Sequence, residues 1–179
     1  MLSSRTKDEV TLAASKRLFK VAPTITKLEQ LKESDIKAKI YPVGFYNTKA
    51  KYLKRLARII VSDFGANIPN NRLDLMKLPG VGRKTANLVI NRAYGIPAIS
   101  VDTHVHKISN LLGWVNTKTP QKTEAALVKI LPKKYWRDVN RLFVSIGRQY
   151  PTKKSLVKFL KKEKLITSSL ISKNDDIAT

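Results

Sequence analysis

Apolar residues recur at every third or fourth position along most of this chain, the spacing that places them on one face of an α-helix. The clearest run predicts a helix over about residues 47–64. Its apolar face carries Leu53, Leu56, Ala57 and Ile60, and its opposite face carries Lys51, Lys54, Arg55 and Arg58. Strand-like alternation of useful length does not occur in the sequence. The pattern therefore predicts an all-α fold.

Capping residues predict where the helices before that run begin. Asp8 is expected to cap a first helix. Thr26 and Glu29 are expected to form a capping box for a second one. Ser34 is expected to cap a third helix that runs through Ile40.

A tight turn is predicted between two further helices. The first of these is short and ends at Leu78, because Pro79 cannot donate to the helical ladder and disfavours helix in the residue before it. Gly80 and Gly82 then permit backbone conformations that are closed to other residues. The next helix is expected to start near Arg83, which makes the segment a helix, a hairpin and a helix.

Apolar stripes predict more helices after the hairpin, over about residues 105–112, 120–131, 136–146 and 152–164. A hinge near Ile96-Pro97 is expected to separate two helical lobes, 1–96 and 97–166, with an active-site cleft between them. Residues 167–179 are polar and are expected to form a mobile tail.

The hairpin is predicted to bind a phosphate. The amides of Val81 and Gly82 and the first N–H groups of the helix after them are expected to converge on one point, which suits a phosphate oxygen. Such a phosphate-binding site does not distinguish one base from another.

Lys84 and Asp102 are the candidate chemical groups. Lys84 lies in the first turn of the second hairpin helix, where the helix dipole favours the neutral amine, a nucleophile. Its alternative is a surface lysine that contacts phosphate. Asp102 precedes a predicted helix, and on spacing alone it is an ordinary N-cap.

The charge of the chain indicates a nucleic-acid partner. Its 35 Lys and Arg residues against 13 Asp and Glu residues give a net charge of +22 over 179 residues, which attracts a polyanion. Solubility alone would explain the basic face of any single helix. A membrane partner is disfavoured, because no run of about 18 apolar residues occurs. The protein is expected to be soluble and intracellular.

Metal chemistry is disfavoured by composition. The chain has no cysteine, which excludes disulfides, zinc–thiolate sites and cysteine-bound iron–sulfur clusters. Its two histidines, His104 and His106, are two residues apart on a predicted helix and therefore point to different faces. No cofactor is expected, although a monovalent cation at the hairpin carbonyls stays open.

Two segments together resemble the helix-hairpin-helix glycosylase superfamily, and most closely the endonuclease III family of DNA glycosylases and AP lyases. They are Leu78-Pro79-Gly80-Val81-Gly82-Arg83-Lys84-Thr85-Ala86 and Val101-Asp102-Thr103-His104. Shorter segments agree, at residues 2–8, 44–50 and 147–148, so the likeness extends to about residue 150.

The resemblance implies roles for named residues. Lys84 would attack C1′ of the damaged nucleoside and form a Schiff base, and Asp102 would activate it or stabilise the developing sugar cation. Contacts to DNA are expected from Leu78, Gly80, Val81, Gly82, Arg83 and Thr85. Arg5 and Phe45 match the positions that fill the gap left by an extruded nucleotide, where the family has glutamine and leucine.

This sequence departs from the family in two places. Most members carry four cysteines after the segment matching Gly147-Arg148, where they hold a four-iron, four-sulfur cluster, and none is present here. The basic helix over about residues 152–164 is a candidate substitute for the cluster loop, facing the duplex with its lysines; surface packing alone is the alternative. Residue 1 also matches a point inside the family's first domain, so the leading helix and most of the next one are expected to be missing unless the true start lies upstream.

The leading functional hypothesis is a monomeric bifunctional DNA glycosylase and AP lyase that acts on oxidised pyrimidines and abasic sites in double-stranded DNA. Two alternatives stay open. One is a monofunctional glycosylase, whose relatives usually lack a lysine where Lys84 stands. The other is a non-catalytic module that uses the hairpin only to bind duplex DNA.

Overall fold

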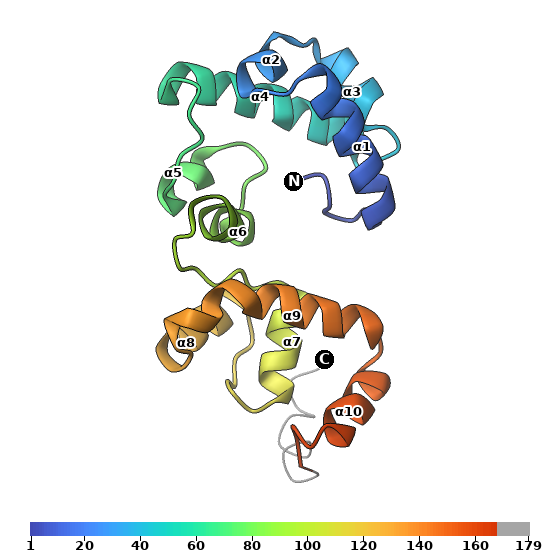
Figure 1. The fold of residues 1–179 in the computed structure, drawn as a ribbon, viewed down its shortest axis with the longest axis vertical. Helices are drawn as coiled ribbons and strands as arrows, with labels where there is room; N and C mark the ends of the chain where they lie inside the picture. The colour runs from blue at the N-terminus through green and yellow to red at the C-terminus, as the bar shows by residue number, and fades with distance from the viewer. Residues whose placement is uncertain (168–179) are drawn as a thin grey trace. The chain divides into compact units, whose positions relative to one another are not determined.

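The computed structural model describes residues 1–167, and their regular structure is helical throughout (Figure 1). The helices are α1 (Asp8–Val21), α2 (Ile25–Gln30), α3 (Glu33–Ile40), α4 (Tyr46–Phe64), α5 (Arg72–Lys77), α6 (Arg83–Tyr94), α7 (Thr103–Leu111), α8 (Pro120–Ile130), the 3₁₀ turn η1 (Lys133–Tyr135), α9 (Trp136–Gln149) and α10 (Lys153–Lys162). The all-α prediction is confirmed for these residues. Within them, no helix is long and apolar enough to cross a membrane.

The chain divides into two compact units, which meet between Ala86 and Asn87. This boundary lies inside α6, before the hinge expected near Ile96-Pro97. The boundary lies there because side chains in the later turns of α6 donate hydrogen bonds to the extended segment that follows the helix. Of the tail predicted for 167–179, all but the first residue lies outside the described part of the chain.

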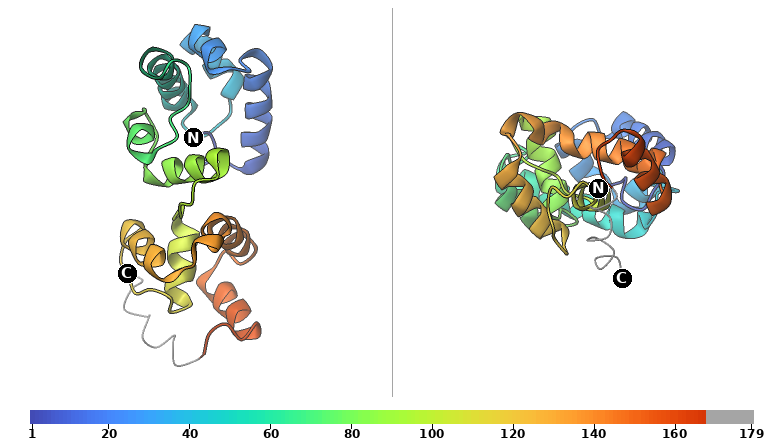
Figure 2. Two further views of the ribbon diagram at one scale, coloured as in Figure 1. Left: turned by 60° about the vertical axis from the view of Figure 1, so that its left-hand side comes forward. Right: turned by 90° about the horizontal axis from the view of Figure 1, so that it is seen from below.

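The first unit is organised around α4, which packs against both α2 and α3, while α1 packs against α3 (Figures 1 and 2). The predicted helix over 47–64 is confirmed to within one residue. Small residues on its inner face, Ala50 and Ala57, are fully buried and allow close approach of the neighbouring helices. The core of this unit consists of Ala14, Leu18, Ala22, Leu28, Ile36, Ile40, Val43, Ala50 and Ala57.

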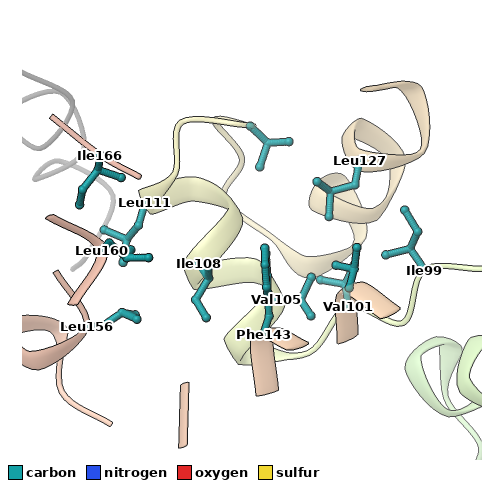
Figure 3. Packing of buried hydrophobic residues seen from close by; sticks show 12 residues of the cluster. Ile99, Val101, Val105, Ile108, Leu111, Leu127, Phe143, Leu156, Leu160 and Ile166 are labelled. Atoms are coloured by element: carbon teal, nitrogen blue, oxygen red, sulfur yellow. The ribbon is translucent and has the colours of Figure 1, made fainter. Parts of the chain in front are cut away.

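The second unit is organised around α7, which contacts α8 and α9. Val105 and Ile108 of α7 are buried, and Figure 3 shows them beside Phe143 of α9. In the same view Leu160 and Ile166 lie close to Leu111 at the end of α7. The whole cluster is Ile99, Val101, Val105, Ile108, Leu111, Val115, Leu127, Val139, Phe143, Leu156, Leu160 and Ile166.

Three predicted helix caps were wrong. The N-cap of α1 is Lys7 and that of α3 is Lys32, and neither makes a side-chain capping bond. Asp8 and Ser34 instead lie inside the first turns, where the Asp8 charge is favoured by the helix dipole. The cap of α2 is Thr24, whose hydroxyl accepts a hydrogen bond from the Lys27 amide at 3.2 Å, so the predicted capping box of Thr26 and Glu29 does not form there.

The helix predicted over 152–164 is present as α10. Thr152 and Ser155 form a capping box at its start. Leu156 and Leu160 are buried, and the Phe159 ring stacks on Tyr150 with 4.3 Å between centroids. The apolar residues of α10 thus pack inward, whereas its contact with DNA stays a prediction.

The two histidines face different neighbours, as predicted. His104 lies against Gly147 of α9, where an added Cβ would come 2.0 Å from its Nδ1. His106 lies against α8, with 2.6 Å between its Nδ1 and the Thr123 hydroxyl. Burial lowers the pKa of His106 below its usual value.

The stability of the second unit is expected to fall in acid because of His106. Folding lowers the pKa of His106, so the unfolded chain binds a proton at this residue more readily than the folded chain does. The free energy of unfolding is therefore highest above pH of about 6.5 and decreases as the pH falls below that value. Urea midpoints measured from pH 8 down to pH 5 should decline in the parent and decline less in His106→Gln. Equal slopes in the two proteins would contradict this role for His106.

Candidate active site

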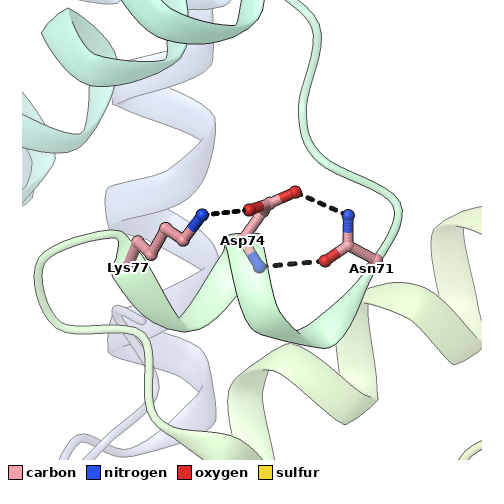
Figure 4. A network of polar contacts seen from close by, with 3 residues as sticks. All are labelled: Asn71, Asp74 and Lys77. Carbon is pink, nitrogen blue, oxygen red and sulfur yellow. Dashed lines mark hydrogen bonds and ion pairs between the residues drawn. The ribbon is translucent and has the colours of Figure 1, made fainter.

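A polar network fixes the short helix that leads into the hairpin (Figure 4). The Asn71 side chain caps α5 by accepting from the Asp74 amide at 2.9 Å, and its Nδ2 donates to Asp74 Oδ2 at 2.7 Å. Lys77 Nζ lies 2.6 Å from Asp74 Oδ1. The hydrogen bond from Lys77, followed by that from Asn71, lowers the pKa of the Asp74 carboxyl. The network caps the start of α5 and links it to Lys77 in its last turn, and it adds little stability because Lys77 is exposed.

The hairpin turns at Gly80, whose φ of +75° lies in the left-handed region. Leu78 before it is buried, and Leu78 O accepts from the Val81 amide at 3.1 Å. This bond commits the Val81 amide to the turn. The predicted phosphate seat is therefore left with Gly82 and the first turn of α6.

Lys84 is exposed in the first turn of α6. The helix begins with a bond from the Ala86 amide to Gly82 O at 2.9 Å, so Lys84 lies at the positive end of the helix dipole, as predicted. Arg83 and Thr85 beside it are half-buried. The Met1 side chain lies beside the hairpin, since a Cβ added at Gly80 would come 3.0 Å from Met1 Cε.

Asp102 lies in the second unit, as the N-cap of α7. Its Oδ1 accepts from the Val105 amide at 2.9 Å, so the capping role expected from spacing is confirmed. Val101 before it is buried, whereas Asp102 itself is half-buried. That Lys84 and Asp102 share a cleft stays a prediction.

Three asparagines hold the segment before Asp102, and sequence reasoning missed all of them. Asn91, Asn87 and Asn140 donate to three consecutive carbonyls, those of residues 98, 99 and 100, at 2.7, 2.9 and 2.9 Å respectively. Asn87 and Asn91 are buried. Asn87 and Asn91 are four residues apart on the apolar face of α6, and two polar residues at this spacing on an apolar face are the sequence signal that could have identified them.

Arg5 and Phe45 come together although 40 positions separate them in sequence. The Arg5 guanidinium carbon lies 5.6 Å from the centre of the Phe45 ring, within the range of a cation–π contact. Phe45 is 62% exposed, so its ring is not part of the core. The two residues form one exposed feature, called here the Arg5–Phe45 tip.

The described residues offer no site for an iron–sulfur cluster. Where most family members are expected to carry cysteines, this chain forms the end of α9 and the start of α10, and the sequence has no thiol to ligate iron. Within residues 1–167, no group of three or more His, Cys, Asp or Glu side chains is placed to hold a metal ion.

Comparison with known proteins identifies the family. The sequence model of the HhH-GPD superfamily of base excision DNA repair proteins matches residues 1–133. Endonuclease III of Thermotoga maritima is 47% identical over 149 residues, which cover 83% of this chain and 70% of that protein. The chain belongs to the endonuclease III family.

Other members of the endonuclease III family agree with this assignment. Endonuclease III-like protein 1 of Gallus gallus is 44% identical over 152 residues, covering 83% of this chain but 54% of that protein. A solved structure of a trapped endonuclease III–DNA covalent intermediate superimposes with a TM-score of 0.79 at 34% identity, over 84% of this chain and 71% of that one. The chain thus spans about half the length of the chicken relative and more of the bacterial one.

Replacing Gly80 is expected to destabilise the hairpin more than replacing Gly95 destabilises the end of α6. Both glycines have positive φ, so alanine should cost about 1–2 kcal/mol of left-handed strain at either position. A Cβ added at Gly80 would also come 2.7 Å from the Tyr52 ring, whereas a Cβ added at Gly95 would have no such neighbour within 4 Å. Urea unfolding of Gly80→Ala and Gly95→Ala should show the larger loss for Gly80→Ala. Equal losses of stability in the two variants would mean that the Tyr52 ring moves aside at no cost.

Proposed function

We propose that this protein is a bifunctional DNA glycosylase and AP lyase of base excision repair. It removes oxidised pyrimidines from duplex DNA and cleaves abasic sites, and it acts as a monomer. The observation that carries the proposal is the exposed Lys84 in the first turn of α6, directly after a glycine hairpin. Membership of the endonuclease III family supports it, because a DNA-bound covalent intermediate of that enzyme has the same fold.

The proposed reaction uses Lys84 as the nucleophile. Its neutral Nζ bonds to C1′ as the N-glycosidic bond breaks, and the base leaves with the electron pair of that bond and takes up a proton. The nitrogen then loses one proton, and the sugar ring opens as the C1′–O4′ bond breaks and O4′ takes up a proton, which gives a protonated Schiff base. Loss of a proton from C2′ breaks the C3′–O bond and cuts the strand 3′ to the lesion.

Asp102 supplies a carboxylate in the proposed reaction. A carboxylate stabilises the cationic sugar that develops as the base leaves, or accepts the proton of the attacking amine. The N-cap bond to Val105 fixes the direction of the carboxylate. The carbonyls held by Asn87, Asn91 and Asn140 fix the backbone just before it.

DNA affinity is assigned to the basic surface and the hairpin. The N–H groups of the first turn of α6 suit a phosphate oxygen. The net charge of +22 supplies attraction that does not depend on sequence. Since chemistry on a base requires its removal from the stack, we assign Arg5 and Phe45 to the gap that the extruded nucleotide leaves.

Borohydride trapping tests the nucleophile. Incubated with duplex DNA that carries one abasic site, the parent should form a reduced covalent adduct, and Lys84→Gln should form none while still binding the duplex. Base release without an adduct would favour a monofunctional glycosylase. Salt-sensitive binding without any product would favour the non-catalytic binding module.

Removal of the Asp102 charge should impair catalysis and spare binding. Asn is as good an N-cap as Asp, so Asp102→Asn is expected to keep the start of α7 intact. Its single-turnover rate of base release should fall by about 10²-fold or more, the scale of a lost acid–base group. A gel-shift assay should show nearly unchanged affinity for a duplex with an uncleavable abasic analogue. A rate close to that of the parent would remove Asp102 from the mechanism.

A further inference from the structure

Lys49 is a buried lysine in the first turn of α4, with only 7% of its surface exposed. Its ammonium donates to Leu2 O at 2.9 Å, to Ser4 O at 2.5 Å and to the Thr6 hydroxyl at 3.3 Å. An ammonium has three donors, and here all three have an acceptor. Every acceptor lies in residues 1–6, so Lys49 binds this segment to α4. Burial lowers the pKa of Lys49.

The Thr6 hydroxyl extends this contact to a second loop. It donates to Ser4 O at 3.2 Å, and it accepts from Lys49 and from the Gly44 amide, the latter at 3.1 Å. A hydroxyl has one donor and two acceptor sites, so all are used. Gly44 lies so close that an added Cβ would come 2.4 Å from Arg5 O. The backbones that carry Arg5 and Phe45 are thus joined by Thr6 and ultimately by Lys49.

Both residues of the Arg5–Phe45 tip have strained backbones. Arg5 has φ of 52° and Phe45 has φ of 57°, in the left-handed region that residues with side chains rarely adopt. Such a conformation is unfavourable for a residue with a side chain and persists only where its surroundings hold it. The hydrogen bonds around Lys49 and Thr6 supply that restraint.

We propose that Lys49 is a positioning residue that clamps the Arg5–Phe45 tip in its strained, exposed form, so that the tip can enter DNA as one rigid unit. The inference rests on the proposed function, since it gives the tip a role on DNA. Without the clamp, the tip would relax toward ordinary backbone conformations. It would then have to be ordered again at each encounter with DNA.

A fluorescent duplex tests the clamp without requiring catalysis. The probe is a duplex with a tetrahydrofuran abasic analogue and 2-aminopurine opposite it, whose fluorescence rises when it loses its stacking partners. The parent should raise the fluorescence at saturating protein. Lys49→Met and Thr6→Val should lose most of that rise, as should Phe45→Ala. Lys16→Met, which removes an exposed lysine of α1, should behave as the parent.

The absence of native cysteines allows a rescue experiment. Lys49→Cys places a single thiol in the chain, which bromoethylamine converts in denaturant to a lysine analogue and iodoacetamide converts to a neutral amide. After refolding, the aminoethylated protein should regain the fluorescence rise and the amide should not. Hydrogen exchange of residues 2–6 and 43–46 in the free protein should slow with the same rescue.

Each outcome decides the proposal. A parent-like fluorescence rise in Lys49→Met and Thr6→Val would overturn it, as would a parent that leaves the 2-aminopurine stacked. Equal recovery with both alkylating reagents would also overturn it, because the charge would then be irrelevant. Failure of the proposed function appears separately, as a parent that gives the fluorescence rise but traps no covalent adduct.

Discussion

Gly80 turns the chain in the left-handed region, and the start of α6 follows from that turn. Tyr52 of α4 fills the space where a side chain on Gly80 would lie, so the hairpin packs against α4 within the first unit. The helix that emerges presents Lys84 in its first turn, at the positive end of its dipole. Proposed phosphate binding and proposed nucleophile thus depend on one backbone conformation.

The segments around the candidate groups have irregular backbones, and side-chain donors restrain them. Lys49 binds carbonyls of residues 2 and 4 in the first unit. In the second unit, three asparagines bind the carbonyls of residues 98–100. A carbonyl outside helices has no regular partner, and burying it without one is costly. Satisfying it from a side chain on a packed helix also fixes where the segment lies, which catalytic geometry requires.

Sequence patterns predicted the helices better than their starts. The apolar stripe on α4 predicted the right element, because periodicity reflects burial along many residues. Asp8 and Ser34 were misplaced as caps because their side-chain type suits both a cap and a first turn. Lys49 was missed among 35 basic residues, although its spacing from Ala50, Leu53 and Ala57 puts it on the buried face. The pairing of Arg5 with Phe45 depends on tertiary contacts that no local pattern contains.

In the proposed reaction, the amine of Lys84 forms the covalent bond to the sugar. The most direct test of this step is peptide mapping by mass spectrometry of the adduct formed with abasic duplex DNA and reduced by borohydride. If Lys84 is the nucleophile, the deoxyribose-derived mass will lie on Lys84 alone. The same mass on Lys49, on the amino group of residue 1, or on a mixture of surface lysines would contradict it.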